Sequence, residues 1–500
     1  MRPTFMGFET ATRGMMAQQK ALDIVGNNVG NIGVTGYTRQ RVDMVSMALS
    51  NTNGRYATNP TGRAGQGVNV TGISQIRDPF LDKRFREEYA DVGYYNKIND
   101  VLGDIESAID EIEPSNMTTA IANFKDAWQK MTNKDPVTTN TVLAAARTMT
   151  QVFKQMDTKL NSTWSQQKYD LEVNVNSVNN ILSGIADLNK TIKDETFNNI
   201  TGNASGAPNE LLDARNVLLD KLSEFGDVQI TTNEDSTVTV KMGKDGHTVV
   251  DGNWNELLTM PVLENGVKVT DVKWQTEGKS ANLTSGSIKA SLDMLNGRGT
   301  AAQPVRGESF DKGILYYKDK IDTFANTFAK TFNDIIPIYD DLGNEIGKKQ
   351  LFSMGSGEDF TAGNIDINSV WAENSNFMLE NAHKPGEGID YTDFANRAVA
   401  AFTKEQNFGE FKGTFDGYVS FYSVANLGNQ RTNVTSRFES CSEISENILK
   451  SISAVSGVSM EEEGVDMVQY TKAYNAMGRV MTALDEALDT LISKTGLVGR

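Results

Sequence analysis

The sequence predicts a mainly α-helical, elongated protein that carries inserted β-structure. Residues 137–198 keep the apolar period of a single helix over about 60 residues, and such a helix is about 90 Å long. Both chain ends carry helical heptads, whereas strand-like alternation of apolar and polar residues begins only in the middle of the chain. We therefore expect a long helical rod domain formed by both chain ends, terminal coiled-coil helices, and small β-rich modules that face outward.

The composition is typical of a folded protein and argues against several classes of function. Of the 500 residues, 23% are charged and 39% are hydrophobic, and the net charge is −17. An acidic chain repels phosphate backbones and anionic lipids, so we expect no nucleic-acid binding. The apolar runs are too short to span a bilayer, so we expect no membrane insertion. Glu9 and Arg13 interrupt the N-terminus, so we expect no cleaved signal peptide there.

The N-terminal segment predicts a helix that ends in a loop rich in glycine and asparagine. Its stripe positions recur at alternating steps of three and four residues, and the apolar ones are Phe5, Phe8, Met15, Leu22 and Val29. Polar residues or glycine occupy the other positions, so this seam is weak. Glycine and asparagine tolerate left-handed backbone angles, so we expect the helix to end, and a hinge loop to begin, within the stretch that contains Gly26, Asn27, Asn28, Gly33 and Gly36.

The C-terminal segment predicts a stronger coiled-coil helix. Its seam continues for about four heptads, and every position is apolar or aromatic. The positions are Met467, Tyr470, Tyr474, Met477, Met481, Leu484, Leu488 and Leu491. Ser459 and Glu462 have the spacing of a capping box at the start, and Gly496 follows the last turn. Burial of one apolar stripe offsets only part of the conformational entropy that the helix loses when it folds. Each terminal helix therefore needs a partner, which is the other helix, a neighbouring subunit, or both.

The rest of the chain predicts alternating blocks of helix and strand. We expect helices at about 88–113, 118–132, 137–198, 209–224, 286–296, 311–335 and 416–457. We expect strands at about 228–231, 237–242, 248–250, 260–263 and 267–275. The predicted domains are an elongated helical domain of 46–225, 286–336 and 410–459, a β-rich domain of 226–285, a small mixed outer module of 337–409, and terminal helices in 1–45 and 460–500.

The sequence contains no motif that indicates catalysis. His247 and His383 lie in predicted loops without the partners that a metal or nucleophile site needs, and the single cysteine, Cys441, lies on an apolar helical stripe. Gly278-Lys279-Ser280 ends like a phosphate-binding loop but lacks the first glycine of that motif. We therefore predict no catalytic, cofactor or metal site and no enzyme. The alternative is an enzyme domain within 226–409, in which folding brings carboxylates together to form a catalytic site.

Both ends of the chain resemble the bacterial flagellar axial proteins, which are the rod, hook and hook-associated proteins. The N-terminal signature is the run from Ala21 to Gln40, and the C-terminal one runs from Gly464 to Leu491. The signature residues of the hinge are Gly26, Asn27, Asn28, Gly33, Gly36, Tyr37, Thr38, Arg39 and Gln40. Within this group the chain is most similar to the hook-associated members, through Tyr37-Thr38-Arg39-Gln40 and through the segment from Asn209 to Asn216, where Asn216 replaces the usual Asp.

The resemblance implies a structural protein at the hook–filament junction, outside the cell. It would form a ring or helical layer at the hook tip, with 1–45 and 460–500 as the inner axial layer that folds on assembly. Its partners would be copies of itself, the hook protein, the second hook–filament junction protein, and a flagellar export chaperone that binds the C-terminal region. It would pass through the flagellar type III export channel, exported without a cleaved signal peptide. The alternative within the group is another axial protein, such as a hook protein.

The resemblance also identifies the seam residues of both terminal helices as the assembly interface. These are Phe5, Phe8, Met15, Leu22, Val29, Met467, Tyr470, Tyr474, Met477, Met481, Leu484, Leu488 and Leu491.

Overall fold

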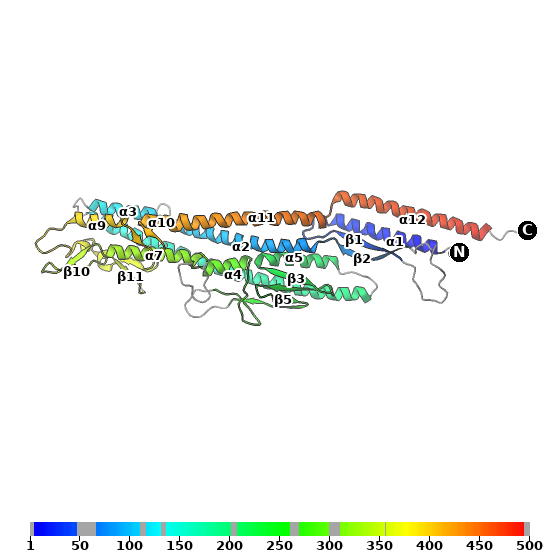
Figure 1. The fold of residues 1–500 in the computed structure, drawn as a ribbon, viewed down its shortest axis with the longest axis horizontal. Helices are drawn as coiled ribbons and strands as arrows, with labels where there is room; N and C mark the ends of the chain where they lie inside the picture. Colours follow the sequence, from blue (N-terminus) through cyan, green and yellow to red (C-terminus); the bar gives the residue numbers. More distant parts are fainter. Residues whose placement is uncertain are drawn as a thin grey trace, which may run out of the picture.

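The protein is a long, mainly helical rod (Figure 1). The computed structural model describes residues 5–47, 67–110, 117–131, 137–201, 208–260, 270–299, 311–355 and 357–494. Both ends of the described chain lie at the same end of the rod, where α1 (Phe5–Gly30) runs beside α12 (Met460–Lys494). Segments from the middle of the sequence form the opposite end. The expectation of a helical rod with inserted β-structure is therefore confirmed.

Four long helices form the shaft of the rod. They are α2 (Pro79–Asp110), α4 (Val137–Thr201), α5 (Asn209–Phe225) and α11 (Asn429–Ser456). Apolar residues of α4 that recur at helical spacing, such as Val178, Leu182 and Ile185, are fully buried, because neighbouring helices cover this face along most of its length. The expected boundaries of α4 and α5 are close to the observed ones, whereas α2 begins well before the predicted residue 88.

A change of helical period precedes α11. The short helix α10 (Phe415–Ser420) continues into a π-helix (Phe421–Gly428), labelled η3, and then into α11 without a break. The sequence predicts Val424 on the buried stripe, but its side chain is 71% exposed. The prediction is wrong here because a π-turn adds a residue and rotates the following positions. Cys441 is half-buried, and burial, followed by the charges of Asp91 and Glu88, raises the pKa of its thiol.

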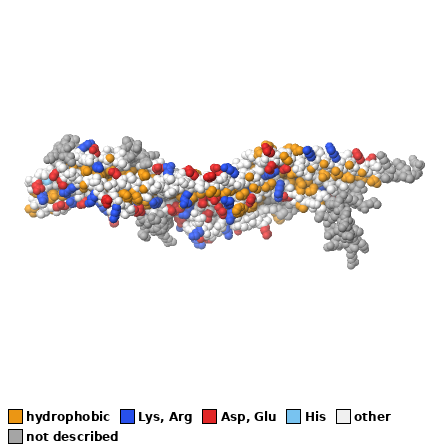
Figure 2. Space-filling model, turned by 45° about the horizontal axis from the view of Figure 1, so that its top comes forward, with side chains coloured by type: hydrophobic (Ala, Val, Ile, Leu, Met, Phe, Trp, Pro, Cys, Tyr) orange, Lys and Arg blue, Asp and Glu red, His pale blue; other side chains and the backbone are white. Residues whose placement is uncertain are grey.

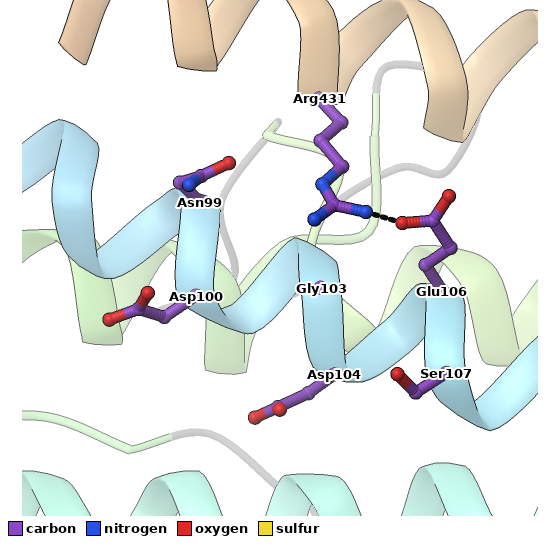
Figure 3. A pocket seen from close by; sticks show the side chains of 7 residues that line it. All are labelled: Asn99, Asp100, Gly103, Asp104, Glu106, Ser107 and Arg431. Atoms are coloured by element: carbon purple, nitrogen blue, oxygen red, sulfur yellow. Dashed lines mark ion pairs between the residues drawn. The ribbon is translucent and has the colours of Figure 1, made fainter. Parts of the chain in front are cut away.

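An ion pair fastens α11 to α2. Arg431 extends from α11 across Gly103 of α2 and pairs with Glu106, as Figure 3 shows. A Cβ placed on Gly103 would lie 3.8 Å from Nη2 of Arg431, an ordinary van der Waals distance. Asp100 and Asp104 lie on α2 beside this pair and point away from Arg431 (Figure 3). The shallow hollow lined by these residues is thus part of a helix–helix contact.

The β-structure in the middle is a small antiparallel sheet held on the shaft. Its strands follow the order β3 (Val228–Thr232), β4 (Val238–Met242), β5 (His247–Asp251) and β6 (Trp254–Asn255). Asn189 of α4 bonds to both N–H and C=O of Val238, which ties α4 to the sheet. A second pair is β7 (Leu258–Thr259) with β8 (Lys273–Trp274). Residues 261–269, which include most of the predicted strand 260–263 and the start of the predicted strand 267–275, lie outside the described residues.

The far end of the rod is built around aromatic side chains. Helices α3 (Met117–Lys130), α7 (Ile314–Asn333) and α9 (Tyr391–Thr403) meet there, whereas α6 (Ser287–Asn296) packs on the shaft against α2, α4 and α7. Two hairpins, β9 (Pro337–Tyr339) with β10 (Glu345–Lys348) and β11 (Phe352–Met354) with β12 (Ile365–Ile367), cover them. Smaller elements complete this end: α8 (Ser369–Glu373), the 3₁₀-helix Ser375–Leu379, β13 (Gln406–Asn407) and β14 (Lys412–Gly413).

The rings of this end form one connected core. Phe124 of α3 lies 5.0 Å from Phe332 of α7 and 5.9 Å from Phe402 of α9, measured between ring centroids. Phe352 of β11 joins the same group. Four elements, α3, α7, β11 and α9, therefore share a single apolar interior at this end.

Candidate assembly interface

The two terminal helices pair antiparallel with a constant register. A Cβ placed on Gly7 would lie 3.0 Å from Cδ1 of Leu484, and one on Gly14 would lie 3.2 Å from Sδ of Met477. Farther along, Nδ2 of Asn28 donates to Oε2 of Glu463 at 3.1 Å. Each step along α1 is matched by an equal step backward along α12, which is the geometry of an antiparallel coiled coil.

The face that α1 buries is made of small residues. Ala11, Gly14, Ala17 and Ala21 are buried, and Ile24 and Val25 continue this face. Because these side chains are short, the larger residues of α12 approach the backbone of α1 closely. The helix also contacts the hairpin of β1 (Gln40–Ser46) and β2 (Val68–Gln75).

The predicted seam of α1 lies beside this face. Phe8, Met15, Leu22 and Val29 are half-buried, and the side chain of Phe5 lies outside the described part of the structure. Hydrophobic spacing does not reveal the small-residue face, because alanine and glycine contribute little to a hydrophobic pattern. The seven-residue recurrence of Gly7, Gly14 and Ala21 is the signal that could have revealed it.

The predicted seam of α12 is only partly covered by α1. Its half-buried members are Tyr470, Met477, Met481, Leu484 and Leu488. Met467 and Tyr474 are 42% and 36% exposed, and Leu491, which continues the line of Met477 and Leu484 by one heptad, is 53% exposed.

Further apolar residues of α12 are open to solvent. Val465, Val468, Val480 and Ile492 are exposed, which means that apolar side chains occupy more than one side of the helix. We call these four residues with Met467, Tyr474 and Leu491 the α12 apolar strip. Figure 2 shows hydrophobic side chains gathered along this end of the rod, beyond a middle section richer in charge. Apolar side chains that stay exposed along one helix are available for a protein–protein contact.

A polar cluster, the basal clasp, joins the paired helices to the shaft. Asn28 is its centre and uses its full hydrogen-bonding capacity. Its Nδ2 donates to the carbonyl of Gln40 at 2.9 Å and to Glu463. Its Oδ1 accepts from the backbone N–H of Gln40 at 3.0 Å and from the hydroxyl of Tyr37 at 2.9 Å. Burial, followed by nearby carboxylates, raises the pKa of Tyr37 to about 12, so its hydroxyl keeps the proton that it donates.

Arg39 connects the clasp to the start of α12. Its Nε donates to Oε1 of Glu463 at 2.7 Å, and its Nη1 donates to Oε2 of Glu462 at 2.6 Å. Its Nη2 lies 3.4 Å from Oδ2 of Asp466. The Glu463 side chain is only 1% exposed, so Arg39 and Asn28 supply the charge and donors that a buried carboxylate requires. Glu462 therefore pairs with Arg39, and not with Ser459 as the capping-box prediction has it.

Thr38 connects the clasp to α5. Its backbone N–H and its hydroxyl both donate to the carboxylate of Asp213, at 3.1 and 2.6 Å. Gln75 of β2 donates to the same carboxylate at 2.8 Å. Burial raises the pKa of Asp213, and the hydrogen bonds from Thr38 and Gln75 act against that rise. The clasp thus fixes the chain between α1 and β1 against both α5 and α12.

The hinge residues occupy two different environments. Helix α1 continues through Gly26, Asn27 and Asn28 and ends at Gly30, within the stretch rich in glycine and asparagine. The hydrogen bonds of Asn28 outweigh its weak helix propensity. Gly33 is exposed and open around its Cα, whereas Gly36 has φ of +82° and packs so closely on Val217 of α5 that a Cβ would collide with it.

The described residues offer no obvious chemical centre. Among them, no group of three or more His, Cys, Asp or Glu side chains is placed to hold a metal ion. None of their helices combines the length and hydropathy that a membrane crossing requires. His247 stacks on Trp274 at 4.6 Å, and His383 lies in the loop before α9.

Comparison with known proteins agrees with this arrangement. The model of the flagellar hook-associated protein FlgK helical domain matches residues 102–350. The chain is also 27% identical over 530 residues to flagellar hook-associated protein 1 of Bacillus subtilis (strain 168), with both chains covered completely. The chain belongs to the flagellar hook-associated protein family. It is therefore a structural component of the bacterial flagellum.

Other matches extend the family relation to both ends of the chain. The model of the flagella basal body rod protein matches residues 8–38, and the C-terminal model of flagellar basal body rod FlgEFG proteins matches residues 452–494. These ranges contain most of α1, most of the clasp and all of α12. The parts that pair at the base of the rod are thus the parts shared with other flagellar axial proteins.

More distant relatives align over part of their length. Flagellar hook-associated protein 1 of Salmonella typhimurium is 27% identical over 357 residues, and that of Escherichia coli (strain K12) is 25% identical over 350 residues. Each alignment covers 69% of this chain and 59% of the relative. The solved structure of the flagellar hook junction protein FlgK from Burkholderia pseudomallei aligns with a TM-score of 0.42 and 19% identity, covering 55% of this chain and 47% of that one.

Proposed function

We propose that the protein joins the hook to the filament by assembling as a ring or helical layer at the hook tip. The α12 apolar strip carries this proposal, because a monomer that leaves these side chains in water gains free energy when neighbours cover them. Family membership supports the same role. The seam residues of α1 and α12 and the inner axial layer of 1–45 and 460–500 are the proposed contacts. The other domains predicted from the sequence form the outer part of the subunit.

The proposed partners are copies of this chain, the hook protein and the second hook–filament junction protein. Each of them needs a complementary apolar surface, and the strip extends over more than one side of α12, which suits a lattice in which several neighbours contact one helix. The chain would travel through the flagellar type III export channel. Before export, a chaperone would cover the C-terminal strip. The protein is proposed to act without catalysis.

A deletion strain tests the role. We expect hooks without filaments in electron micrographs, together with flagellin shed into the medium. Loss of the hook itself would instead identify the chain as a hook protein. Normal filaments on the deletion strain would contradict a junction role altogether.

A matched pair of substitutions tests the surface. Leu491 in the strip and Val370 of α8, at the other end of the rod, are 53% and 51% exposed. We expect Leu491→Asp to leave most hooks without filaments, because burial of an unpaired carboxylate in the lattice is costly. Val370→Asp places the same charge outside the proposed contact and should leave the filaments intact. If both variants assemble normally, the strip is not the assembly surface.

A further inference from the structure

A hollow with several charged side chains in its lining lies where α2, α5 and the β3–β4 sheet meet. It has a volume of about 620 Å³ and lies on the shaft, away from the α12 apolar strip. Four cationic side chains line it: Arg77, Lys83, Arg86 and Arg215. The lining includes only two acidic side chains, Asp82 and Glu87. The hollow is therefore positive in a chain whose net charge is strongly negative.

Arg215 lacks a carboxylate partner in this hollow. Its residue is 4% exposed, and its Nη1 donates to neutral acceptors, Oδ1 of Asn189 at 3.1 Å and the carbonyl of Ser236 at 2.7 Å. Within the described residues it forms no ion pair, and its buried Nε has no hydrogen-bond partner. Burial, followed by the charge of Arg86, lowers the pKa of Arg215 to about 10. A buried cation without a counter-charge is costly, so the site favours an anion.

Arg86 contributes a second open donor. It is 7% exposed, and its Nε pairs with Oδ1 of Asp220 at 2.7 Å. Its Nη2 is buried and has no partner among the described residues. Two guanidinium groups that approach from different helices, each with a free N–H, match the several acceptor oxygens of one oxyanion. By contrast, Arg77 is paired with Asp82 at 2.5 Å.

We propose that this hollow is a binding site for a small oxyanion of phosphate or carboxylate chemistry, held by Arg86 and Arg215. The anion would bridge α2 to α5. Arg215 also bonds to Ser236 and, through Asn189, to the strand that carries Val238, so the bound anion would strengthen the attachment of the sheet to the shaft.

Thermal unfolding of the full chain in phosphate, acetate or chloride at equal ionic strength tests the site. We expect phosphate, acetate or both to raise the Tm with a saturating dependence on concentration, because an anion that binds only the folded state stabilises it. Saturation separates binding from general salt exclusion, which increases steadily with concentration. A rise in Tm with phosphate alone would show that the site binds a tetrahedral oxyanion. A rise in Tm with acetate would show that it binds a carboxylate. Equal responses to all three salts would overturn the proposal.

Asn216→Asp provides the decisive variant. Asn216 lines the same hollow as Arg86 and Arg215, so its replacement puts a carboxylate into the hollow that competes with the free anion. We expect a higher Tm without added anion and an affinity for the anion that is lower by about tenfold or more, the loss that a competing charge–charge interaction of this kind produces. Asn447→Asp, which makes the same change on the exposed face of α11, should respond like the parent chain.

Calorimetric titration of the unmodified folded chain with phosphate provides a second measurement that needs no variant. Heat of binding at one site per chain supports the proposal. Absence of binding heat at several temperatures, or an unchanged affinity in Asn216→Asp, contradicts it.

Discussion

At the scale of single residues, the base of the rod depends on side chains whose bonding capacity is completely used. Asn28 donates twice and accepts twice, although asparagine is a poor helix former. Glu463 is buried and receives hydrogen bonds from both Arg39 and Asn28. Because an unpaired buried carboxylate or amide is costly, each of these residues fixes the position of the others. The clasp is therefore a specific joint between α1, α12 and the shaft.

The backbone conformation and packing of Gly36 require glycine at this position. Its φ of +82° disfavours any residue with a Cβ, and that Cβ would also collide with Val217. We expect Gly36→Ala to destabilise the clasp by about 1–3 kcal/mol, which hydrogen exchange of β1 amides would report as faster exchange. Gly33→Ala is the matched control, since nothing lies within 4 Å of its Cβ position and its φ is not positive. Equal exchange in both variants would contradict a role for Gly36 in the joint.

Single residues also show which contacts the sequence alone could not predict. The segment from Tyr37 to Gln40 stands out in the sequence, but its partners do not, because Arg39 and Glu463 are separated by 424 positions. Acidic residues are common at the start of a helix, and this alone accounts for Glu461, Glu462 and Glu463. The sequence therefore gives no sign that Glu463 also makes tertiary contacts. Similarly, the lack of a counter-charge for Arg215 depends on which side chains the fold places around it.

At the scale of elements, periodicity predicted the long helices well because their partners cover one continuous face. Helix α4 has that face along most of its length, and the boundaries predicted for it were close. The prediction was less successful where the contact does not depend on large apolar residues. Helix α1 buries alanine and glycine against α12, and the π-helix before α11 changes the period, so neither contact could be located from hydrophobic spacing.

The small face of α1 leads to a prediction for the helix pair. Gly14 is buried against Met477, and we expect Gly14→Leu to force α12 away, with an overpacking cost of about 1–3 kcal/mol. Amides of α12 near Met477 should then exchange faster. Gly26→Leu makes the same change on the exposed side of the same helix and should be neutral or slightly stabilising, because leucine is the better helix former.

A second substitution separates packing from other causes. Met477→Ala, combined with Gly14→Leu, makes space for the new side chain and should restore part of the protection of α12. A Gly14→Leu variant that exchanges like the parent chain would mean that the close approach of the two helices is not required for their pairing.

At the scale of the whole molecule, the two ends of the rod differ in how much of their surface is buried. The far end encloses an aromatic core supplied by several segments. Most residues of α12, by contrast, are exposed, and its principal contact is a single helix. Local stability follows the number of buried apolar contacts, so the rod should be rigid along the shaft and weakest at its base. This gradient suits a subunit whose base becomes fully packed only among neighbours.

Hydrogen exchange of the free chain tests this gradient. We expect fast exchange in residues 465–494, intermediate exchange in α1, which also contacts the β1–β2 hairpin, and slow exchange in α4. Incorporation into hooks should slow amide exchange in α12, by about tenfold for each 1.4 kcal/mol by which assembly stabilises this helix. The exchange rates of α4 should not change. Equal protection of α12 and α4 in the free chain would mean that the terminal pair is already complete. Assembly would then have to draw its free energy from another surface.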